Sequence, residues 1–387
     1  MKRLLIITDL YPDSNNPIGG IFVQHQVIEL AKYYQICVYA TYLGSVDHIE
    51  EGIDQGFRIV RNYSAYHQKV YLSSVLSYKK KVLPHLQQTI LAFSPDFIHV
   101  HDCRHVPELI NLAPMLASLA IPKYLTLHNI STHPSKIKNS FSAFVYRGYM
   151  ATSLKGWDHV FTVNKSLQEI VSAYTTSKQV SVIGNAISEP AEEFDTCMID
   201  RVSSFSAQAE LRIISAGNLL KTKGFDLLIS AVNKLVRMGV DAVLVIAGAG
   251  NMRPFLEKQI IELDLQKRVN LLGSVANGTL RRLYPLFDVF VLPSFSETFG
   301  IVYLEAMDAG IPTVGVKGQG IDSIIINGAN GWLVEPKSIE SIVDTLLAIH
   351  SHPEQSKAIA KRGKITVETH HRLTNLCNRL RSVYENR

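Results

Sequence analysis

Short runs of consecutive apolar residues, separated by longer amphipathic stretches, recur along this chain and restrict its fold more than any other feature. The run at residues 243–247, Val-Leu-Val-Ile-Ala, contains no polar residue. A strand that is apolar on both faces belongs in a parallel sheet that helices cover on each side. The alternation of such strands with helices predicts right-handed βαβ units and doubly wound sheets, an α/β fold. We expect strands at residues 4–8, 35–39, 97–100, 123–127, 159–162, 180–183, 211–216, 242–247, 269–272, 289–292, 313–315 and 331–334, and helices at 23–33, 224–238, 251–265 and 300–310.

The pattern is interrupted once, at residues 188–195, which are polar and have no period. Because 387 residues exceed one typical hydrophobic core, we interpret this segment as the linker between two Rossmann-like domains. We predict an N-terminal domain at residues 1–187 and a C-terminal domain at residues 188–369. A last helix, at residues 370–387, is expected to pack back on the N-terminal domain.

The composition is that of an ordinary globular protein, with 47% hydrophobic and 19% charged residues. The net charge of +5 is far from the basic stripe of a nucleic-acid binder, so nucleic acid is excluded as a partner. The four cysteines are scattered and form no zinc or redox motif, which suits a reducing compartment. No apolar run approaches the roughly 18–20 residues that a membrane helix needs, and the first residues do not form a signal peptide. We therefore expect a cytoplasmic protein.

Two glycines, Gly19 and Gly20, lie between the first expected strand and the first expected helix. Paired glycines before a helix let backbone N–H groups approach a phosphate or a sugar. This loop follows the carboxyl end of a strand, where open α/β sheets bind ligands. The alternative interpretation is an ordinary surface turn.

Two acidic residues flank the start of a helix that follows the strand at residues 289–292. Glu297 is expected in the loop and Glu305 in the helix, among apolar neighbours. A buried carboxylate needs hydrogen-bond partners, which ribose hydroxyls would supply. Free N–H groups at residues 299–301 could hold a diphosphate or sugar hydroxyls. Alternatively, Glu297 is only an acid near a helix start and Glu305 a solvated one.

The segment at residues 215–224 also joins a strand to a helix. Its Lys223, just before Gly224, could reach a phosphate held over the edge of the sheet. The alternative is a solvated lysine.

Histidines cluster near two strand ends. His128 follows the strand at residues 123–127 and is either an active-site or a structural histidine. His99 and His101 share one face of a strand, with His105 beyond it. Because no third and fourth ligand is evident, we expect no metal there.

Three consecutive lysines, residues 79–81, lie in an apolar and aromatic context. They predict either a helix on an anionic membrane surface or a solvated helix face.

The loops at residues 19–20, 217–224 and 297–305 together resemble the family 4 glycosyltransferases, in particular bacterial enzymes of polysaccharide biosynthesis. That family has the GT-B fold, two Rossmann-like domains facing a central cleft. An N-terminal Gly-Gly loop, a Gly-Arg-Leu-x3-Lys-Gly loop and a Glu-x7-Glu motif surround its nucleotide-sugar. Glu297 and Glu305 have the spacing of the last motif. The arginine of the second motif is Asn218 here, and whether Lys221 replaces it stays open.

The resemblance implies a role for each matching residue. Lys223 would neutralise the leaving diphosphate, Glu297 would hold a donor-sugar hydroxyl, and Glu305 would hold the ribose. His128 matches the family's active-site histidine, and Gly20 would let its loop close over the phosphate. The implied catalytic residues are His128, Glu297 and Lys223, and the implied donor-binding residues are Gly19, Gly20, Asn218, Lys223, Glu297, Phe299, Gly300, Ile301 and Glu305.

The function so implied is that of a retaining glycosyltransferase of the hexosyltransferase type. The C-terminal domain would bind a UDP- or GDP-sugar, and the N-terminal domain a glycan or lipid-linked acceptor, in surface polysaccharide synthesis. No cofactor and no bound metal are expected, and the protein would act in the cytoplasm or at the inner face of the membrane. The alternatives are a non-enzymatic nucleotide-sugar sensor or subunit and a nucleotide-sugar epimerase. A dinucleotide dehydrogenase is disfavoured, because no Gly-x-Gly-x-x-Gly follows the first strand.

Overall fold

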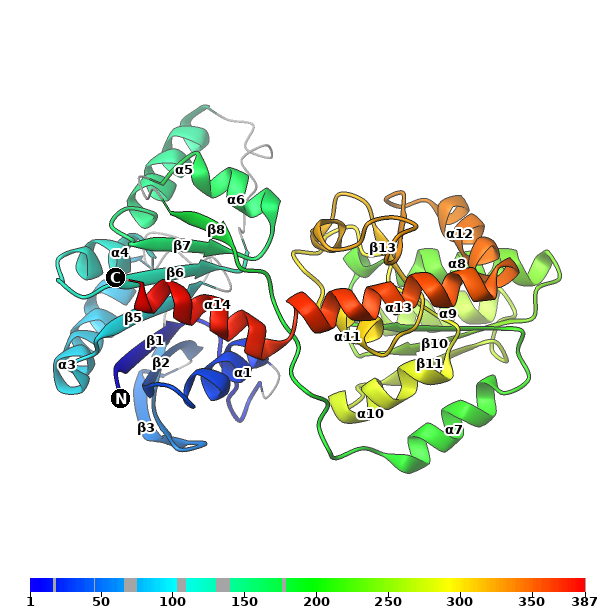
Figure 1. Ribbon diagram of the computed structural model, residues 1–387, viewed down its shortest axis with the longest axis horizontal. Helices are drawn as coiled ribbons and strands as arrows, with labels where there is room; N and C mark the ends of the chain where they lie inside the picture. The colour runs from blue at the N-terminus through cyan, green and yellow to red at the C-terminus, as the bar shows by residue number, and fades with distance from the viewer. Residues whose placement is uncertain are drawn as a thin grey trace. The chain divides into compact units, whose positions relative to one another are not determined.

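A computed structural model describes residues 1–16, 19–44, 46–65, 75–102, 109–129, 140–175 and 179–386. The chain divides into two compact units (Figure 1). Unit 1 comprises Met1–Asn185 and Leu373–Arg387, and unit 2 comprises Ala186–Arg372. The polypeptide therefore passes from unit 1 to unit 2 and back again.

Unit 1 is built on one sheet with the strand order β3-β4-β2-β1-β5-β6-β7-β8. Among the strand pairs of the described residues, only β3 runs antiparallel to its neighbour, and the other pairs are parallel. The order reverses at β1 and β5, so the loops after these two strands lie at the topological switch point, where such sheets bind ligands. The strands are β1 (Arg3–Thr8), β2 (Gln35–Gly44), β3 (His48–Asp54), β4 (Phe57–Ala65), β5 (Phe97–Asp102), β6 (Lys123–Leu127), β7 (His159–Thr162) and β8 (Val180–Val182).

Both faces of this sheet are covered. On one face, Leu5 and Ile7 of β1 belong to a buried cluster with side chains of α3, α4 and α5. The other face meets α14, whose Tyr384 ring contacts Phe97 of β5 and Tyr124 of β6. α14 also packs against α1, and the Tyr34 hydroxyl donates to Glu385 at 2.7 Å. The helices are α1 (Ile21–Leu30), α3 (Leu83–Phe93, continuing the π-helical turn Tyr78–Val82), α4 (Leu109–Ala117), α5 (Ser140–Ser153), α6 (Lys165–Ser172) and α14 (Leu373–Glu385).

Unit 2 has a six-stranded sheet with the order β11-β10-β9-β12-β13-β14. All of its strand pairs are parallel, and the order reverses at β9 and β12. β10 is buried along its whole length, which explains why its sequence is apolar throughout. The strands are β9 (Leu211–Ala216), β10 (Ala242–Ala247), β11 (Val269–Gly273), β12 (Val289–Val291), β13 (Thr313–Val316) and β14 (Trp332–Val334).

The helices of unit 2 follow its strands. They are α7 (Thr196–Ser206), α8 (Phe225–Arg237), α9 (Arg253–Glu262), α10 (Asn277–Leu283), α11 (Ile301–Asp308), α12 (Ile339–Ser351) and α13 (Pro353–His370), with short 3-10 turns at Lys221–Lys223, Tyr284–Leu286 and Gly320–Ser323. Among the described residues, no helix is both long and apolar enough to cross a bilayer.

The twelve predicted strands are confirmed, and so is the α/β class with doubly wound sheets. Two strands, β3 and β4, were not predicted. β3 is almost entirely exposed and carries His48, Glu50, Glu51 and Asp54, so it lacks the apolar run that marked the others. Backbone hydrogen bonds to β4 hold β3 in the sheet, and its side-chain pattern gives no sign of this pairing. The helix α7, directly after the interrupted segment, was not predicted either.

Candidate functional site

Three loops of unit 2 meet at the carboxyl edge of its sheet. They follow β9, β12 and β13. The N–H of Phe295 and the hydroxyl of Ser294 both donate to the Thr222 carbonyl, at 3.0 and 3.2 Å. The N–H of Gly320 donates to the Glu297 carbonyl at 3.0 Å. The loops therefore form one hydrogen-bonded layer at the switch point.

Lys223 and Glu297 form an ion pair within this layer. The Lys223 ammonium donates to Oε2 of Glu297, and both side chains are largely buried, at 18% and 13% exposed. The two residues lie far apart in sequence, on the loops after β9 and β12. The structure therefore brings together two of the predicted site residues, with one positive and one negative group at the same point.

The backbone of Glu297 is fixed from the loop after β13. Its N–H donates to Oε1 of Gln319 at 3.0 Å, while its carbonyl accepts from Gly320. A Cβ on Gly320 would lie 2.0 Å from the Thr298 carbonyl oxygen, so the two loops could not approach as closely with any other residue there. Sequence reasoning missed Gln319, because nothing near it in the chain indicates its partner.

Two more glycines let the loops and the following helices pack. Gly224 has a φ of +70°, and a Cβ on it would lie 2.5 Å from the Pro293 carbonyl oxygen. Gly300 has a φ of +79° and precedes the first residue of α11, Ile301. The first-turn N–H groups of a helix have no partner inside the helix, and they carry the positive end of its dipole. The start of α11, with Phe299 buried beside it, therefore presents donors at the same edge as Lys223.

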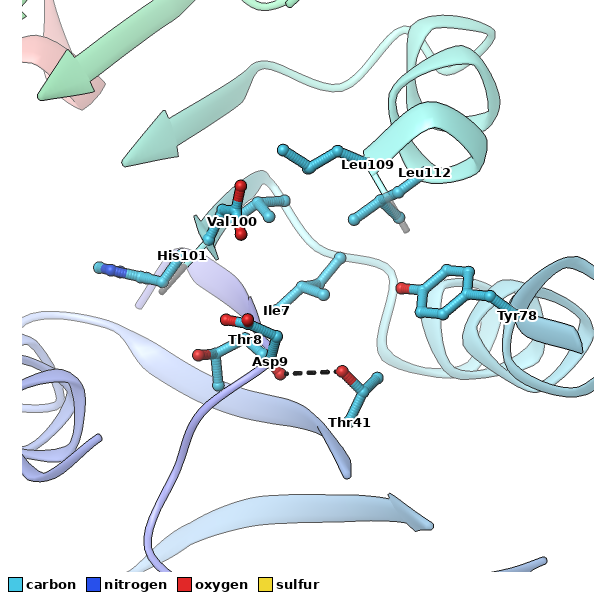
Figure 2. Close-up of a pocket in the computed structure, with 10 residues that line it drawn as sticks. Ile7, Thr8, Asp9, Thr41, Tyr78, Val100, His101, Leu109 and Leu112 are labelled. Carbon is cyan, nitrogen blue, oxygen red and sulfur yellow. Dashed lines mark hydrogen bonds between the residues drawn. The ribbon is translucent and has the colours of Figure 1, made fainter. Parts of the chain in front are cut away.

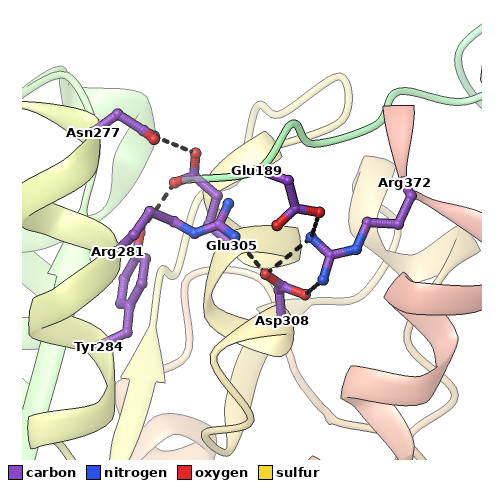
Figure 3. Close-up of polar contacts among 7 residues, drawn as sticks. All are labelled: Glu189, Asn277, Arg281, Tyr284, Glu305, Asp308 and Arg372. Atoms are coloured by element: carbon purple, nitrogen blue, oxygen red, sulfur yellow. Dashed lines mark hydrogen bonds and ion pairs between the residues drawn. The ribbon is translucent and has the colours of Figure 1, made fainter. Parts of the chain in front are cut away.

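Glu305 is not a solvated acid, which rules out the alternative interpretation of this residue. It is 6% exposed, and its carboxylate accepts from Nδ2 of Asn277 at 2.7 Å and from the Tyr284 hydroxyl at 3.3 Å (Figure 3). Burial raises the pKa of Glu305, while the Arg281 guanidinium and these hydrogen bonds oppose that rise. Its carboxylate can accept further hydrogen bonds, since the two oxygens offer about four lone-pair sites.

One turn further along α11, Asp308 holds two arginines (Figure 3). The buried Arg281 of α10 donates to Asp308, and Arg372 donates to its other oxygen at 2.6 Å. Arg372 also lies 3.4 Å from Glu189. The N–H of Ile187 donates to the His371 carbonyl at 2.9 Å. The first and last segments of unit 2 are thus joined to each other and to α11.

The remaining predicted residue of this edge, Asn218, is exposed, as is Lys221. Asn218 is the second residue after β9, in a loop that packs closely against the next one: a Cβ on Gly248 would lie 1.9 Å from the Gly217 carbonyl oxygen. Neither the Asn218 nor the Lys221 side chain is packed in the core.

In unit 1, the predicted His128 pairs with His101. Nδ1 of His101 and Nε2 of His128 lie 3.1 Å apart, so one imidazole donates and the other accepts. Burial lowers the pKa of His101 to about 3 and that of His128 well below its usual value. Both rings are therefore neutral at physiological pH. His99 contacts the hydroxyls of Tyr384 and Thr126, at 2.5 and 2.7 Å, and burial lowers its pKa as well.

A small cavity lies beside the end of β1 and β5 (Figure 2). Its volume is about 20 Å³, room for roughly one water molecule. Thr8, Asp9, His101 and Asp102 line it, and the Tyr78 hydroxyl points toward Ile7 and Asp9. Sequence reasoning did not select Asp9 or Asp102, although acids at two strand ends beside a switch point are a readable signal. Within the described ranges, no group of three or more His, Cys, Asp or Glu side chains could hold a metal ion; His105 lies outside them.

Gly20 ends the loop between β1 and α1. It has a φ of +72°, and a Cβ on it would lie 2.1 Å from the Leu10 carbonyl oxygen. The N–H of Gly19 donates to the Asn16 carbonyl at 3.2 Å. At Gly19 and Gly20, the described end of this loop, the backbone is closely packed.

Replacing Asp308 with Asn should destabilise unit 2. The substitution removes the carboxylate that pairs with both the buried Arg281 and Arg372, and breaking a buried pair from one side costs about 3–5 kcal/mol. The control is Glu340→Gln, which removes the acid of the exposed pair with Lys234 and should cost less than about 1 kcal/mol. Urea unfolding of both variants measures the difference, and equal midpoints would contradict the assignment.

The stability of unit 1 should fall on acidification. Below pH 6.5 the unfolded chain protonates its histidines, whereas buried His99, His101 and His128 stay neutral, so proton binding lowers the free energy of the unfolded state relative to the folded state as the pH drops. The limiting slope is about 1.4 kcal/mol per pH unit for each histidine. Unfolding should be followed between pH 7.5 and pH 5. His101→Gln should flatten the pH dependence by about one-third of the three-histidine slope. An unchanged slope would show that His101 does not contribute to the pH dependence of stability.

Comparison with known proteins gives matches in both units. Residues 22–189 match the model of the family described as Glycosyltransferase Family 4, and residues 199–366 that of Glycosyl transferases group 1. An uncharacterized glycosyltransferase of Methanocaldococcus jannaschii is 39% identical over 198 residues, 49% of this chain and 50% of that protein. A GDP-mannose-dependent alpha-(1-6)-phosphatidylinositol monomannoside mannosyltransferase of Mycobacterium tuberculosis is 27% identical over 231 residues, 54% of this chain and 59% of that protein. The chain thus spans about half the length of these curated relatives.

A crystal structure of HepE from Anabaena, in complex with UDP-glucose, has the same fold. The TM-score is 0.73 at 18% sequence identity, and the superposition covers 99% of this chain and 100% of that chain. The two family models together match both α/β units, and the fold extends over the whole chain. The chain belongs to the family 4 glycosyltransferases and has the GT-B fold.

Proposed function

We propose that this protein is a retaining glycosyltransferase that moves a hexose-type sugar from a UDP- or GDP-sugar to a glycan or lipid-linked acceptor. The observation that carries the proposal is the Lys223–Glu297 pair at the switch point between β9 and β12. A cation and a carboxylate held together at a helix start suit a ligand that carries a diphosphate and sugar hydroxyls.

The diphosphate would take the Lys223 ammonium, and Glu297 would then accept a hydrogen bond from the donor sugar. A charge-assisted bond to a phosphate oxygen is strong enough to replace the existing ion pair, since both partners keep a charged or hydroxyl contact. N–H groups of Phe299, Gly300 and Ile301 would add donors around the phosphate and sugar. Asn218 would lie beside the phosphates, with Lys221 as the nearest additional cation of the same loop.

Glu305 would accept hydrogen bonds from the two ribose hydroxyls. Its present partners, Asn277 and Tyr284, hold the carboxylate in one orientation and leave further lone pairs to use.

The transfer itself is a direct displacement. The bond between the anomeric carbon and the diphosphate oxygen breaks, the acceptor oxygen bonds to that carbon on the same face, and the acceptor proton passes to the leaving phosphate. No protein nucleophile is required, so catalysis rests on stabilising the diphosphate. Lys223 and the first turn of α11 would provide this stabilisation, and no metal or cofactor is needed.

The relatives support the donor class. HepE was crystallised with UDP-glucose, and the mycobacterial relative is named as GDP-mannose-dependent. We therefore keep both UDP- and GDP-sugars as donors. His128, Gly19 and Gly20 keep the active-site and phosphate-loop roles that their match to the family motifs gives them. A role in surface polysaccharide synthesis fits the same resemblance.

We also propose that the protein acts in the cytoplasm and associates weakly with the inner face of the membrane. Lys79, Lys80 and Lys81 are exposed on the turn Tyr78–Val82, whose first and last residues are buried. Lys81 lies 2.9 Å from Asp47, so Lys79 and Lys80 would supply most of the attraction to anionic lipid.

Asn218 favours one second candidate, a nucleotide-sugar sensor or inactive subunit. With an amide in place of a guanidinium, the site has one fixed cation fewer for a developing charge. A sensor would bind the donor and leave it intact, so turnover separates the two.

A nucleoside diphosphate should stabilise the protein selectively. Thermal unfolding with UDP, GDP, ADP and NAD tests this, since a ligand at 100 times its Kd adds about 2.7 kcal/mol. Lys223→Ala should abolish most of the shift and lower kcat/KM for transfer about 100-fold or more. Lys357→Ala, which removes an exposed lysine of α13, should change neither. A shift with NAD alone, or none with any nucleotide, would contradict the proposal.

Asn218→Arg should strengthen donor binding about tenfold or more, because a charge-assisted hydrogen bond to phosphate contributes about 1.5–3 kcal/mol. Gln355→Arg adds the same charge on the exposed side of α13 and should leave affinity unchanged. Isothermal titration with the preferred nucleoside diphosphate measures both. Equal affinities for the two variants would show that Asn218 does not lie beside the phosphates.

A further inference from the structure

A polar groove of unit 1 lies outside every residue that the proposed function uses. It is formed by the loop after β1, by α1 and by the β3–β4 hairpin, and its volume is about 370 Å³. That volume falls in the range of small-ligand sites, about 300–1,000 Å³. The side chains that matter for its chemistry are Asp13, Gln24, Glu50, Asp54, Arg61 and Tyr63.

The groove is organised in the absence of a ligand. Asp13 accepts from the N–H groups of Asn15 and Asn16 at 3.0 and 2.7 Å, and from the Tyr63 hydroxyl at 3.3 Å. The Tyr63 ring is stacked between Tyr42 and His48, with ring centres 4.7 and 4.3 Å away. The wall of the groove therefore keeps a fixed shape, which lowers the entropy cost of ligand binding.

The charges of the groove have one dominant sign. Three carboxylates, Asp13, Glu50 and Asp54, and one guanidinium, Arg61, line the groove. Arg61 pairs with Asp54 at 3.7 Å and lies opposite Glu50 in the β3–β4 register. Its buried Nε–H has no acceptor among the described residues. The groove thus repels anions, while it offers both donors and acceptors to a polar ligand.

These groups match a sugar. Carboxylates, amides and guanidinium groups each present two polar atoms side by side, and neighbouring hydroxyls of a pyranose can engage both at once. The excess of carboxylates adds attraction for an ammonium group. The groove also begins at the loop that leads into Gly19 and Gly20, and Gln24 belongs to the first turns of α1.

We propose that this groove binds a sugar unit of the acceptor that is uncharged or carries an ammonium group, and that it rejects phosphorylated sugars. The inference rests on the proposed function, because it assigns the ligand to the acceptor. It restricts the range of acceptors by their charge, since it excludes those whose terminal sugar carries a phosphate.

Binding of three matched probes to the full chain tests the proposal. Methyl α-D-glucopyranoside, glucosamine with its amine protonated, and glucose 6-phosphate differ mainly in charge. Saturation-transfer NMR should rank glucosamine first and the methyl glucoside second, with glucose 6-phosphate not bound. Glu50→Gln, at an exposed position, should weaken glucosamine about threefold or more relative to the methyl glucoside, as expected when one nearby charge is lost. Glu354→Gln, which removes an exposed acid of α13, should leave the ranking unchanged.

Two results would overturn the inference. One is binding of glucose 6-phosphate as strong as that of glucosamine, and the other is a ranking that Glu50→Gln and Glu50→Gln/Asp54→Asn both leave unchanged. Nucleotide-induced thermal shifts on the same samples keep the two proposals apart. Nucleotide binding without sugar binding removes only the groove. Charge-ranked sugar binding without any nucleotide shift supports the groove as a sugar site and removes the donor proposal.

Discussion

The parallel pairing of β9 with β12 is the constraint on which the candidate site depends. In a doubly wound sheet, these two strands are neighbours in space although β10 and β11 separate them in sequence. Their pairing is enforced by burial, because β12 is buried at every residue and β9 at all but one. As a result, the Lys223 loop and the Glu297 loop leave the sheet side by side. The charged groups of the site are thus brought together by two buried strands that contain neither of them.

The sequence was sufficient for the parts of the fold that apolar runs mark. Fully buried strands such as β10 can be recognised because a parallel interior tolerates no polar alternation. The hairpin β3–β4 could not be recognised in this way, since β3 lies at the edge of its sheet and exposes nearly all of its side chains. The missed hairpin supplies Glu50, Asp54 and Arg61, so the groove of unit 1 was invisible to the same reasoning.

Much the same holds for the candidate site. The spacing of Glu297 and Glu305, together with the family motif, was enough to select both residues, but their surroundings come from distant segments. Gln319 holds the Glu297 backbone from beyond the next strand, and Asn277 and Tyr284 reach Glu305 from α10 and the 3-10 turn that follows it. Hydrogen bonds of this kind depend on how elements pack, and no local pattern encodes them. The pairing of His101 with His128 is an intermediate case: strand period puts His101 at a strand end, but only the neighbouring strand β6 brings His128 to it.

The place of α14 has a consequence for how the chain is made. Unit 2 is one continuous segment, whereas unit 1 requires residues from both sides of it. At synthesis rates of about 5–20 residues per second, α14 follows the rest of unit 1 after roughly 10–40 s. During that interval the sheet face that receives Tyr384, with His99 on it, has no cover from α14, although the strands and other helices of unit 1 have already been made. The N-terminal half of the chain thus has a sheet face that stays without its covering helix until synthesis is nearly finished.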